Sequence, residues 1–262
     1  MSLYSLFNSI GTYAFLITNL FFLKRKKLVM SRRALAAKDF FAKKSQDNLV
    51  FKLLGSITFW AVVETVLFSA LHYLPVGAVN TMFGSLVGTG ANYFGFLFIM
   101  PVVMTAVFCF MGVDPLDQFD IVTPCLPCAL IFVKIACFFE GCCYGIQSPY
   151  GVYFSDRGLF EVPVQLIESF NALIIFLFLL SYKKFAKKGT MYPVYMFFYS
   201  ITRFFSEFLR HEKNILWIFK TYHILCFIGM ILGVVSFIFV LTRREKLENF
   251  LYKFSYKGKL NK

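Results

Sequence analysis

The stretch Val164–Tyr182, with the sequence VQLIESFNALIIFLFLLSY, decides the fold class of this 262-residue chain. A helix that crosses a bilayer needs roughly 20 mostly apolar residues, and this stretch is close to that length. Its polar residues Gln165 and Glu168 lie near its beginning, whereas its second half is almost wholly apolar. The stretch therefore predicts a transmembrane helix with polar groups toward one end.

Six further stretches meet the same criterion, and they are Leu3–Leu23, Leu53–Leu74, Phe83–Met111, Phe119–Phe139, Met191–Leu209 and Tyr222–Thr242. The composition agrees, because 58% of the residues are hydrophobic and only 16% are charged, against about a quarter in a soluble domain. We therefore predict an all-α, polytopic membrane protein with seven transmembrane helices. We expect a single membrane domain over residues 1–242 and a basic cytoplasmic tail over residues 243–262.

The distribution of Lys and Arg predicts the orientation, since cytoplasmic loops of membrane proteins are enriched in both. The segments Lys24–Lys52, Lys183–Lys188 and 243–262 carry ten, four and seven of them, and the segments on the opposite side carry only four in all. With seven spans, this count places the N-terminus outside and the C-terminus in the cytoplasm. It also accounts for the net charge of +13 without a nucleic-acid partner, because the basic residues fall between apolar runs.

Charged residues within the predicted spans indicate a polar site in the membrane. A charge at the centre of a spanning helix costs about 2.5–3.5 kcal/mol on insertion scales, so it usually faces a partner or a wet cavity. One interpretation is structural ion pairing between helices, and the other, which the spacing favours, is a chamber that binds a charged group. The residues concerned are Glu64, Lys134, Glu168, Arg203 and Glu207.

Helical spacing arranges polar side chains in three stripes. We expect Arg203 and Lys134 to hold a phosphate together, Arg203 by a forked pair of hydrogen bonds and Lys134 as a point charge. Glu207 and Glu168 would neutralise these cations in the empty site. The stripes consist of Tyr199, Arg203, Glu207 and Arg210, of Glu161, Gln165 and Glu168, and of Lys134, Cys137 and Gly141.

The segment Glu140-Gly-Cys-Cys-Tyr-Gly145 brackets two cysteines with glycines. Glycine allows a close approach of the backbone, and glycines near a helix end expose N–H groups that can hold an anion. Glu140, Gly141, Cys142, Cys143 and Gly145 are therefore candidates for substrate binding.

Three ordered motifs resemble those of the prolipoprotein diacylglyceryl transferases. They are Lys134-Ile-Ala-Cys-Phe-Phe-Glu-Gly-Cys-Cys-Tyr-Gly145, Val162-Pro-Val-Gln-Leu-Ile-Glu168 and Tyr199-Ser-Ile-Thr-Arg-Phe-Phe-Ser-Glu-Phe-Leu-Arg210. The resemblance implies a bacterial plasma-membrane enzyme that moves the diacylglyceryl group of phosphatidylglycerol to the cysteine thiol of a prolipoprotein. Its partners would be this phospholipid and the signal-peptide region of the acceptor.

The same resemblance implies roles for individual residues. Lys134 and Arg203 would bind the phosphate, and Glu207 would orient Arg203, so these three form the expected catalytic set. Gly145 would shape the lipid pocket. Tyr13 matches a tyrosine in the first span of the family, and Gln165, Glu168, Tyr199 and Arg210 complete the expected substrate-binding set.

The chain also departs from the family pattern at several positions. Phe94 stands where the family has a histidine in a Phe-His-Gly-Gly segment, and Lys134 replaces the Arg that begins the signature. A phenylalanine cannot accept a proton, so a general-base role at this position is lost. The departures leave open a second function, that of a non-catalytic lipid-binding, anion-binding or transport protein on the same fold.

Five cysteines lie between residues 125 and 143, and Cys125 and Cys128 form a C-x-x-C pair. This spacing occurs in zinc and thiol-exchange sites, but no histidine or second C-x-x-C pair completes such a site in the sequence. Buried cysteine is more often a small hydrophobic residue. We therefore predict neither a metal nor a cofactor, and a thiol-redox membrane enzyme is the third alternative.

Overall fold

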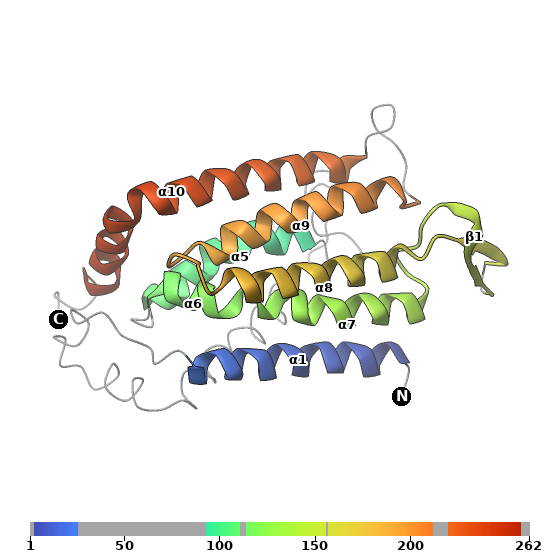
Figure 1. Cartoon of the computed structure of the whole chain (residues 1–262), viewed down its shortest axis with the longest axis horizontal. Helices are drawn as coiled ribbons and strands as arrows, with labels where there is room; N and C mark the ends of the chain where they lie inside the picture. The colour runs from blue at the N-terminus through green and yellow to red at the C-terminus, as the bar shows by residue number, and fades with distance from the viewer. Residues whose placement is uncertain (1–2, 26–92, 111–113, 156, 212–219, 258–262) are drawn as a thin grey trace, which may run out of the picture. The chain divides into compact units, whose positions relative to one another are not determined.

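The computed structural model describes residues 3–25, 93–110, 114–155, 157–211 and 220–257 (Figure 1). The basic loop predicted after the first span, the second span Leu53–Leu74 with Glu64, and residues 83–92 of the third span lie outside these residues. The chain forms two compact units, residues 1–19 with 116–247 and residues 20–115 with 248–262. The single membrane domain over residues 1–242 stays a prediction.

The first unit is a bundle of helices. The first part of α1 (Leu3–Arg25) belongs to it, together with α6 (Pro115–Val122), α7 (Cys125–Glu140), α8 (Val164–Tyr182), α9 (Met191–Phe208) and most of α10 (Thr221–Lys257). Helix α7 packs against α8, and α8 packs against α9 (Figure 1). The α10 helix changes direction at Arg243, whose backbone is not helical. The bounds of α8 are those that the apolar run predicts.

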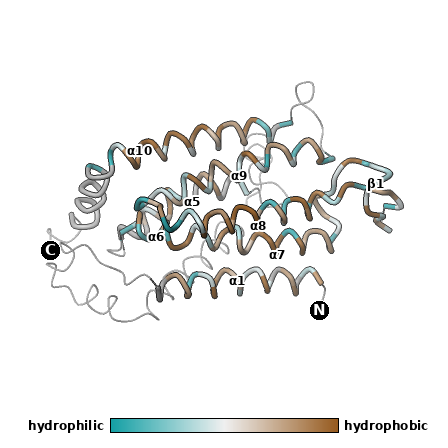
Figure 2. Tube along the Cα trace, in the orientation of Figure 1, coloured by the Kyte–Doolittle hydropathy of each residue, from teal (hydrophilic) through white to brown (hydrophobic). Residues whose placement is uncertain are grey.

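Three segments of the described residues are long and apolar enough to cross a membrane, and they are Pro115–Glu140, Val164–Tyr182 and Tyr222–Arg243. Hydrophobic residues dominate along α8 and the first part of α10 (Figure 2). The outer face of α10 exposes large apolar side chains, including Ile231, Val235 and Ile238. Such a face is stable against lipid rather than water, so the protein is a membrane protein.

The predicted span Phe119–Phe139 is not one continuous helix. It is interrupted at Thr123 and Pro124, which form a turn between α6 and α7. Proline has no N–H to donate, and its ring clashes with the carbonyl four residues earlier, so an uninterrupted helix is unfavourable there. The hydroxyl and the backbone N–H of Thr123 both donate to the carbonyl of Phe119, at 2.6 and 2.9 Å. The break gives α7 its own start and so sets the position of Lys134.

The prediction of an all-α fold missed a β-hairpin in the connection between α7 and α8. Strand β1 (Gln147–Phe154) pairs antiparallel with β2 (Leu159–Glu161), and Tyr153 lies opposite Phe160. The polar stripe that was predicted to run from Glu161 along α8 is also wrong, because Glu161 belongs to β2. Its carboxylate pairs with Arg157, 2.8 Å from Nη2. The hairpin extends beyond the ends of α7 and α8 (Figure 1).

A buried carboxylate fixes the turn from α8 to α9. Asp120, on α6, accepts hydrogen bonds from the backbone N–H of Gly189 at 2.8 Å and of Met191 at 3.3 Å. Gly189 has a φ of 82°, a left-handed conformation that favours glycine. Met191 is the first residue of α9. Asp120 thus caps the helix that carries Arg203 and Glu207.

The second unit contains α5 (Tyr93–Phe110), which continues through Pro101. Phe94, at the position of the missing histidine, is 1% exposed, and its ring lies 5.7 Å from that of Phe98. The position is therefore apolar.

Candidate functional site

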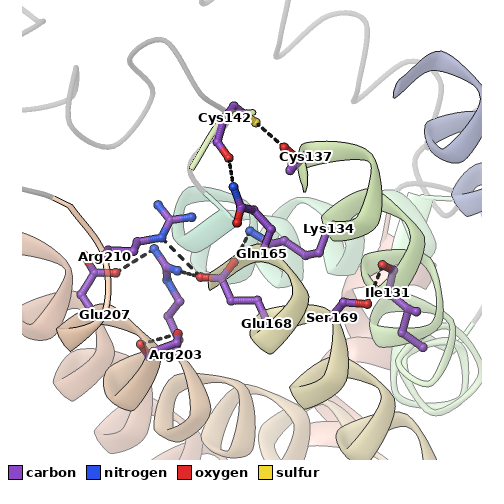
Figure 3. Close-up of polar contacts among 11 residues, drawn as sticks. Ile131, Lys134, Cys137, Cys142, Gln165, Glu168, Ser169, Arg203, Glu207 and Arg210 are labelled. Atoms are coloured by element: carbon purple, nitrogen blue, oxygen red, sulfur yellow. Dashed lines mark hydrogen bonds and ion pairs between the residues drawn. The ribbon is translucent and has the colours of Figure 1, made fainter. Parts of the chain in front are cut away.

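Glu168, on the first turns of α8, is the centre of a buried network of charges (Figure 3). Its Oε2 lies 2.5 Å from Nζ of Lys134 on α7, and its Oε1 pairs with Nη1 of Arg203 on α9. Nε of Arg210 lies 3.4 Å from the same Oε1. One carboxylate thus joins cations from the two neighbouring helices and from the residues just after α9.

Arg203 bridges two carboxylates through the two arms of its guanidinium group. Nη1 contacts Glu168, and Nη2 lies 2.8 Å from Oε2 of Glu207, one turn later on α9. Residues four apart lie on the same face of a helix, so this second pair follows from the sequence spacing. Glu207 is fully buried and Arg203 is 7% exposed. The fork is therefore held in one orientation in a region of low dielectric constant.

Among the described residues, the network contains three cations and two carboxylates. A buried lysine that the motif analysis missed adds a further cation nearby. Nζ of Lys220 lies 2.7 Å from the carbonyl of Glu207 and 2.5 Å from that of Arg210, so it caps the end of α9. Lys220 lies between two predicted spans, where lysines are common. No signal in the sequence therefore marks it as part of the site. A concentration of cations at one place favours an anionic ligand.

A small, partly open pocket adjoins the network. The expected residues Lys134, Glu168, Tyr199 and Arg203 line it, and their stripes therefore meet at one place. The wall also contains polar and apolar residues that the motif analysis did not single out, namely Leu130, Asn171, Ala172, Ile175, Thr202 and Ser206. The pocket wall therefore combines charged groups with apolar ones.

Gln165 connects the network with the cysteine-containing turn after α7. Its Nε2 donates a hydrogen bond to the carbonyl of Cys142 at 2.5 Å, and the side chain is fully buried (Figure 3). Its Oε1 is buried and has no hydrogen-bond partner among the described residues. A buried acceptor without a partner costs about 1–3 kcal/mol, which a ligand hydroxyl can recover.

Gly145 joins the hairpin base to the end of α9. It forms an isolated β-bridge with Arg210, and its N–H donates to the carbonyl of Val162 at 3.2 Å. A Cβ on Gly145 would lie 2.5 Å from the carbonyl oxygen of Val162 and 2.7 Å from that of Leu209. The glycine is therefore required for close backbone approach. This close approach fixes the backbone of Arg210 beside Gly145. The predicted effect of Gly145 on a lipid pocket stays a prediction.

Arg157 ties the hairpin to the turn after α7. Its Nη1 donates to the carbonyl of Gly141 at 2.9 Å, and its guanidinium lies over the ring of Tyr144, 4.0 Å from the centroid. Gly141 itself ends α7 with a φ of 69°, a conformation typical of a glycine C-cap. The carbonyl of Gly141 thus has a structural partner.

Three thiols gather at the end of α7. The sulfur atoms of Cys137, Cys142 and Cys143 all lie within 4.8 Å of one another, and they are the one such group of potential metal ligands among the described residues. Hydrogen bonds from the thiols of Cys137 and Cys142, together with the charges of Arg210 and Lys134, hold the pKa of Cys143 below its ordinary value. Hydrogen bonding within the group raises the pKa of Cys142. The spacing in the sequence separates these residues, and the turn brings them together.

Two expected residues lie at exposed positions. Tyr13, on α1, is 63% exposed, so its ring faces the surroundings of the bundle. Glu140, the last residue of α7, is exposed as well. Their predicted roles in substrate binding stay predictions, whereas the other candidate residues lie in the network, in the pocket wall or in the turn beside them.

The bundle defines a membrane protein with a polar, positively charged site among its apolar helices. The sequence model of a protein family, described as prolipoprotein diacylglyceryl transferase, matches residues 2–239 of the chain. The chain therefore belongs to this family.

Three relatives carry the name phosphatidylglycerol–prolipoprotein diacylglyceryl transferase. The enzyme numbered 2 of Clostridium perfringens is 38% identical over 107 residues, which cover 38% of this chain and 42% of the relative. That of Clostridium tetani is 33% identical over 109 residues, which cover 38% and 44%. That of Campylobacter curvus is 27% identical over 195 residues, which cover 68% and 72%. The chain thus spans less than half of the length of the two clostridial relatives.

Proposed function

We propose that the protein moves the diacylglyceryl group of phosphatidylglycerol to the cysteine thiol of a prolipoprotein in a bacterial plasma membrane. The observation that carries the proposal is the network of Lys134, Glu168, Arg203 and Glu207 beside a pocket, in a chain that belongs to this family. The relatives are bacterial and bear the name of this reaction.

The phosphate of the lipid takes the place at which Glu168 contacts Lys134 and Arg203. A phosphodiester carries a single negative charge, which these cations stabilise. Arg203 contacts it through the guanidinium fork, while Glu207 keeps the fork in orientation at 2.8 Å. Lys134 contacts it as a point charge. The buried Oε1 of Gln165 is suited to accept a hydrogen bond from a hydroxyl of the glycerol headgroup.

The transfer is a displacement at carbon. The sulfur of the acceptor cysteine attacks the diacylglyceryl carbon that bears the phosphate ester; a C–S bond forms and the C–O bond breaks. The electron pair of the broken bond leaves with glycerol phosphate, and the thiol proton ends on this leaving group. Lys134 and Arg203 stabilise the negative charge that grows on the phosphate in the transition state.

One observation favours a second function, that of a non-catalytic lipid-binding protein. Phe94 is buried and apolar at the position where the family pattern has a histidine, so it offers no base for the acceptor thiol. A lipid-binding protein needs the network of charges but has no need of such a base.

A transfer assay separates the two functions. Purified protein in detergent is given phosphatidylglycerol with a labelled diacylglyceryl group and a lipobox peptide, and the labelled peptide is measured. Arg203→Lys should lower the rate roughly 100-fold, because a lost transition-state contact of about 3 kcal/mol has this effect and an ammonium cannot reproduce the fork. Arg243→Lys, the same change at an exposed residue of α10, is the control and should keep the wild-type rate.

Two results would contradict the proposal. Wild-type protein that binds phosphatidylglycerol without transferring it would support the non-catalytic function. Equal rates for Arg203→Lys and wild type would exclude the guanidinium fork as the phosphate ligand.

We infer seven spans with the N-terminus outside and the C-terminus in the cytoplasm. The 19 residues of α8 extend for about 28 Å, close to the thickness of the hydrocarbon core. The basic turn after α8 and the hairpin before it therefore belong to opposite sides. Lys188 pairs with Asp117 at 3.3 Å, which supports the start of the segment Pro115–Glu140 on the side of the basic turn.

Labelling of single cysteines tests this orientation in intact cells. A cysteine introduced at Ser148, in the hairpin, should react with a membrane-impermeant maleimide, and one introduced at Lys187 should react only after lysis. The native cysteines are first replaced by serine. A reactive cysteine at Lys187 in intact cells would overturn the orientation.

A further inference from the structure

The thiol group formed by Cys137, Cys142 and Cys143 has the composition and spacing of a metal site. Metal-bound sulfur atoms lie about 2.3 Å from zinc, which corresponds to roughly 3.8 Å between two sulfur atoms in tetrahedral geometry. The three sulfur atoms lie within 4.8 Å of one another before any ion is bound. Shifts of about an ångström or less therefore complete the site.

The backbone of the turn brings the third thiol into the group. Cys143 is the one non-glycine residue with a positive φ, 60°, among the described residues. A cysteine in this conformation is uncommon and unfavourable, and such positions often serve a function. The sulfur of Cys142 is near as well, since it donates to the carbonyl of Cys137 at 3.6 Å. Three thiols thus converge from residues of one helix end and the following turn.

The thiol group lies beside the phosphate-binding cations. Cys137 follows Lys134 by three residues on α7, so the two side chains are neighbours on one face of the helix. The carbonyl of Cys142 is hydrogen-bonded to Gln165, which lies one turn before Glu168. Arg210 forms a backbone bridge with Gly145, two residues after Cys143. These cations would offset the negative charge of a thiolate-bound metal.

The sulfur of an acceptor thiol attacks carbon as a thiolate, so the thiol has to lose its proton first. Phe94 offers no base for this step at the position where the family pattern has a histidine. A thiol that binds a metal ion loses its proton outright. Three protein ligands with an open fourth position are typical of catalytic zinc sites.

We propose that Cys137, Cys142 and Cys143 bind a soft d¹⁰ metal ion of the zinc type, and that the acceptor cysteine of the prolipoprotein becomes its fourth ligand as a thiolate. The first half stands on the geometry of the three thiols, and the second half rests on the proposed transfer function. On binding, the acceptor thiol gives its proton to water. Its sulfur then attacks the diacylglyceryl carbon, the C–O bond breaks, and glycerol phosphate takes up a proton from water.

Metal binding is tested first and without reference to activity. The full chain in detergent, reduced with a phosphine, is titrated with Co²⁺, whose absorption reports tetrahedral thiolate ligation, and then with Zn²⁺ in competition. We expect equimolar binding in the wild type and loss of the thiolate bands in Cys137→Ser and Cys143→Ser. Cys128→Ser is the matched control, because Cys128 lies on the same helix outside the group, 3.5 Å from the hydroxyl of Thr18. It should bind as the wild type does.

A lipobox peptide then tests the fourth position. Addition of the peptide to the Co²⁺ form should shift the visible bands, and a peptide with serine in place of the acceptor cysteine should leave them unchanged. Removal of the metal by a chelator should lower the transfer rate roughly 100-fold, the contribution of a missing base, and Zn²⁺ should restore it.

The outcomes separate the two proposals. Wild-type protein without thiolate bands, or Cys137→Ser and Cys143→Ser variants that bind as the wild type does, would overturn the metal site. A mass of the unreduced chain that is lower by two hydrogen atoms would indicate a disulfide. If the chain then takes up no metal after reduction, the metal site is overturned as well. Absorption bands that stay unchanged when the cysteine peptide is added would overturn only the role of the acceptor cysteine as the fourth ligand. Thiolate bands that respond to the peptide in a protein that transfers nothing would refute the transferase and leave the metal site intact.

Discussion

Replacement of Glu168 by glutamine tests whether the charge network holds the bundle together. The substitution keeps the size and shape of the side chain and removes one negative charge. In the wild type, Glu168 contacts Lys134 at 2.5 Å, Arg210 at 3.4 Å and Arg203. The variant leaves three cations with Glu207 as the one carboxylate of the network. Buried cations then lose the partner that offsets the cost of their desolvation.

The magnitude follows from the burial of the partners. Removal of one partner from a buried ion pair costs about 3–5 kcal/mol. The amide oxygen of glutamine still accepts one hydrogen bond from a cation and recovers about 1–2 kcal/mol of this. We therefore expect a net loss of roughly 2–3 kcal/mol, and a fall in melting temperature of about 4–12 °C at 2–4 °C per kcal/mol.

The measurement is thermal unfolding of the purified protein in detergent, followed by near-ultraviolet circular dichroism. Glu161→Gln is the matched control, since Glu161 is buried to a similar degree, at 3% exposed, but contacts one cation, Arg157, whose side chain is 25% exposed. Its loss should be smaller than that of Glu168→Gln, because water reaches the one cation that loses its partner. A melting temperature of Glu168→Gln at or above that of Glu161→Gln would refute the reasoning.

A double variant of Glu168 and Lys134 tests whether the two side chains stabilise each other. Lys134→Met alone should destabilise the protein, because it removes a cation that contacts Glu168. In the Glu168→Gln background the same change should raise the melting temperature, because it removes a buried charge that has lost its partner. Coupling between groups in contact is about 0.5–3 kcal/mol. Additive effects of the two substitutions would contradict the network.

Two further variants test the contacts that position the site. Gly145→Ala should lower the free energy of unfolding by about 1–3 kcal/mol, because its Cβ would lie 2.5 Å from the carbonyl oxygen of Val162 and 2.7 Å from that of Leu209; unchanged thermal unfolding would contradict the close approach. Asp120→Asn should cost about 1–2 kcal/mol, because an amide accepts more weakly from the N–H groups of Gly189 and Met191 than a carboxylate does. Hydrogen exchange at the start of α9 should accelerate in this variant, and exchange at the wild-type rate would show that the cap is dispensable.

The membrane class, the bounds of α8 and the pairing of Arg203 with Glu207 were predictable from the sequence. Apolar runs of about 20 residues are a local property, and the bounds of α8 coincide with such a run. The pairing of Arg203 with Glu207 was predictable for the same reason, because residues four apart share a helical face. The membership of the family followed from motifs, which are local as well.

The relations between helices were decided by the tertiary structure. Glu168 meets Lys134 and Arg203, 34 and 35 residues away, because α7, α8 and α9 pack side by side. Periodicity assigns a residue to a face but does not say which neighbour that face meets. The stripes therefore contained the residues of the charge network, but they did not predict that Glu168 lies at its centre.

Irregular segments escaped the sequence analysis for a related reason. The hairpin of β1 and β2 depends on Arg157 and on the backbone contact of Gly145 with the end of α9, and no run of residues encodes either contact. The convergence of three thiols depends on the left-handed backbone of Cys143. Helical periodicity and hydropathy act over a few neighbouring residues, whereas these contacts form only after distant parts of the chain have packed, and that is why the tertiary structure alone decided them.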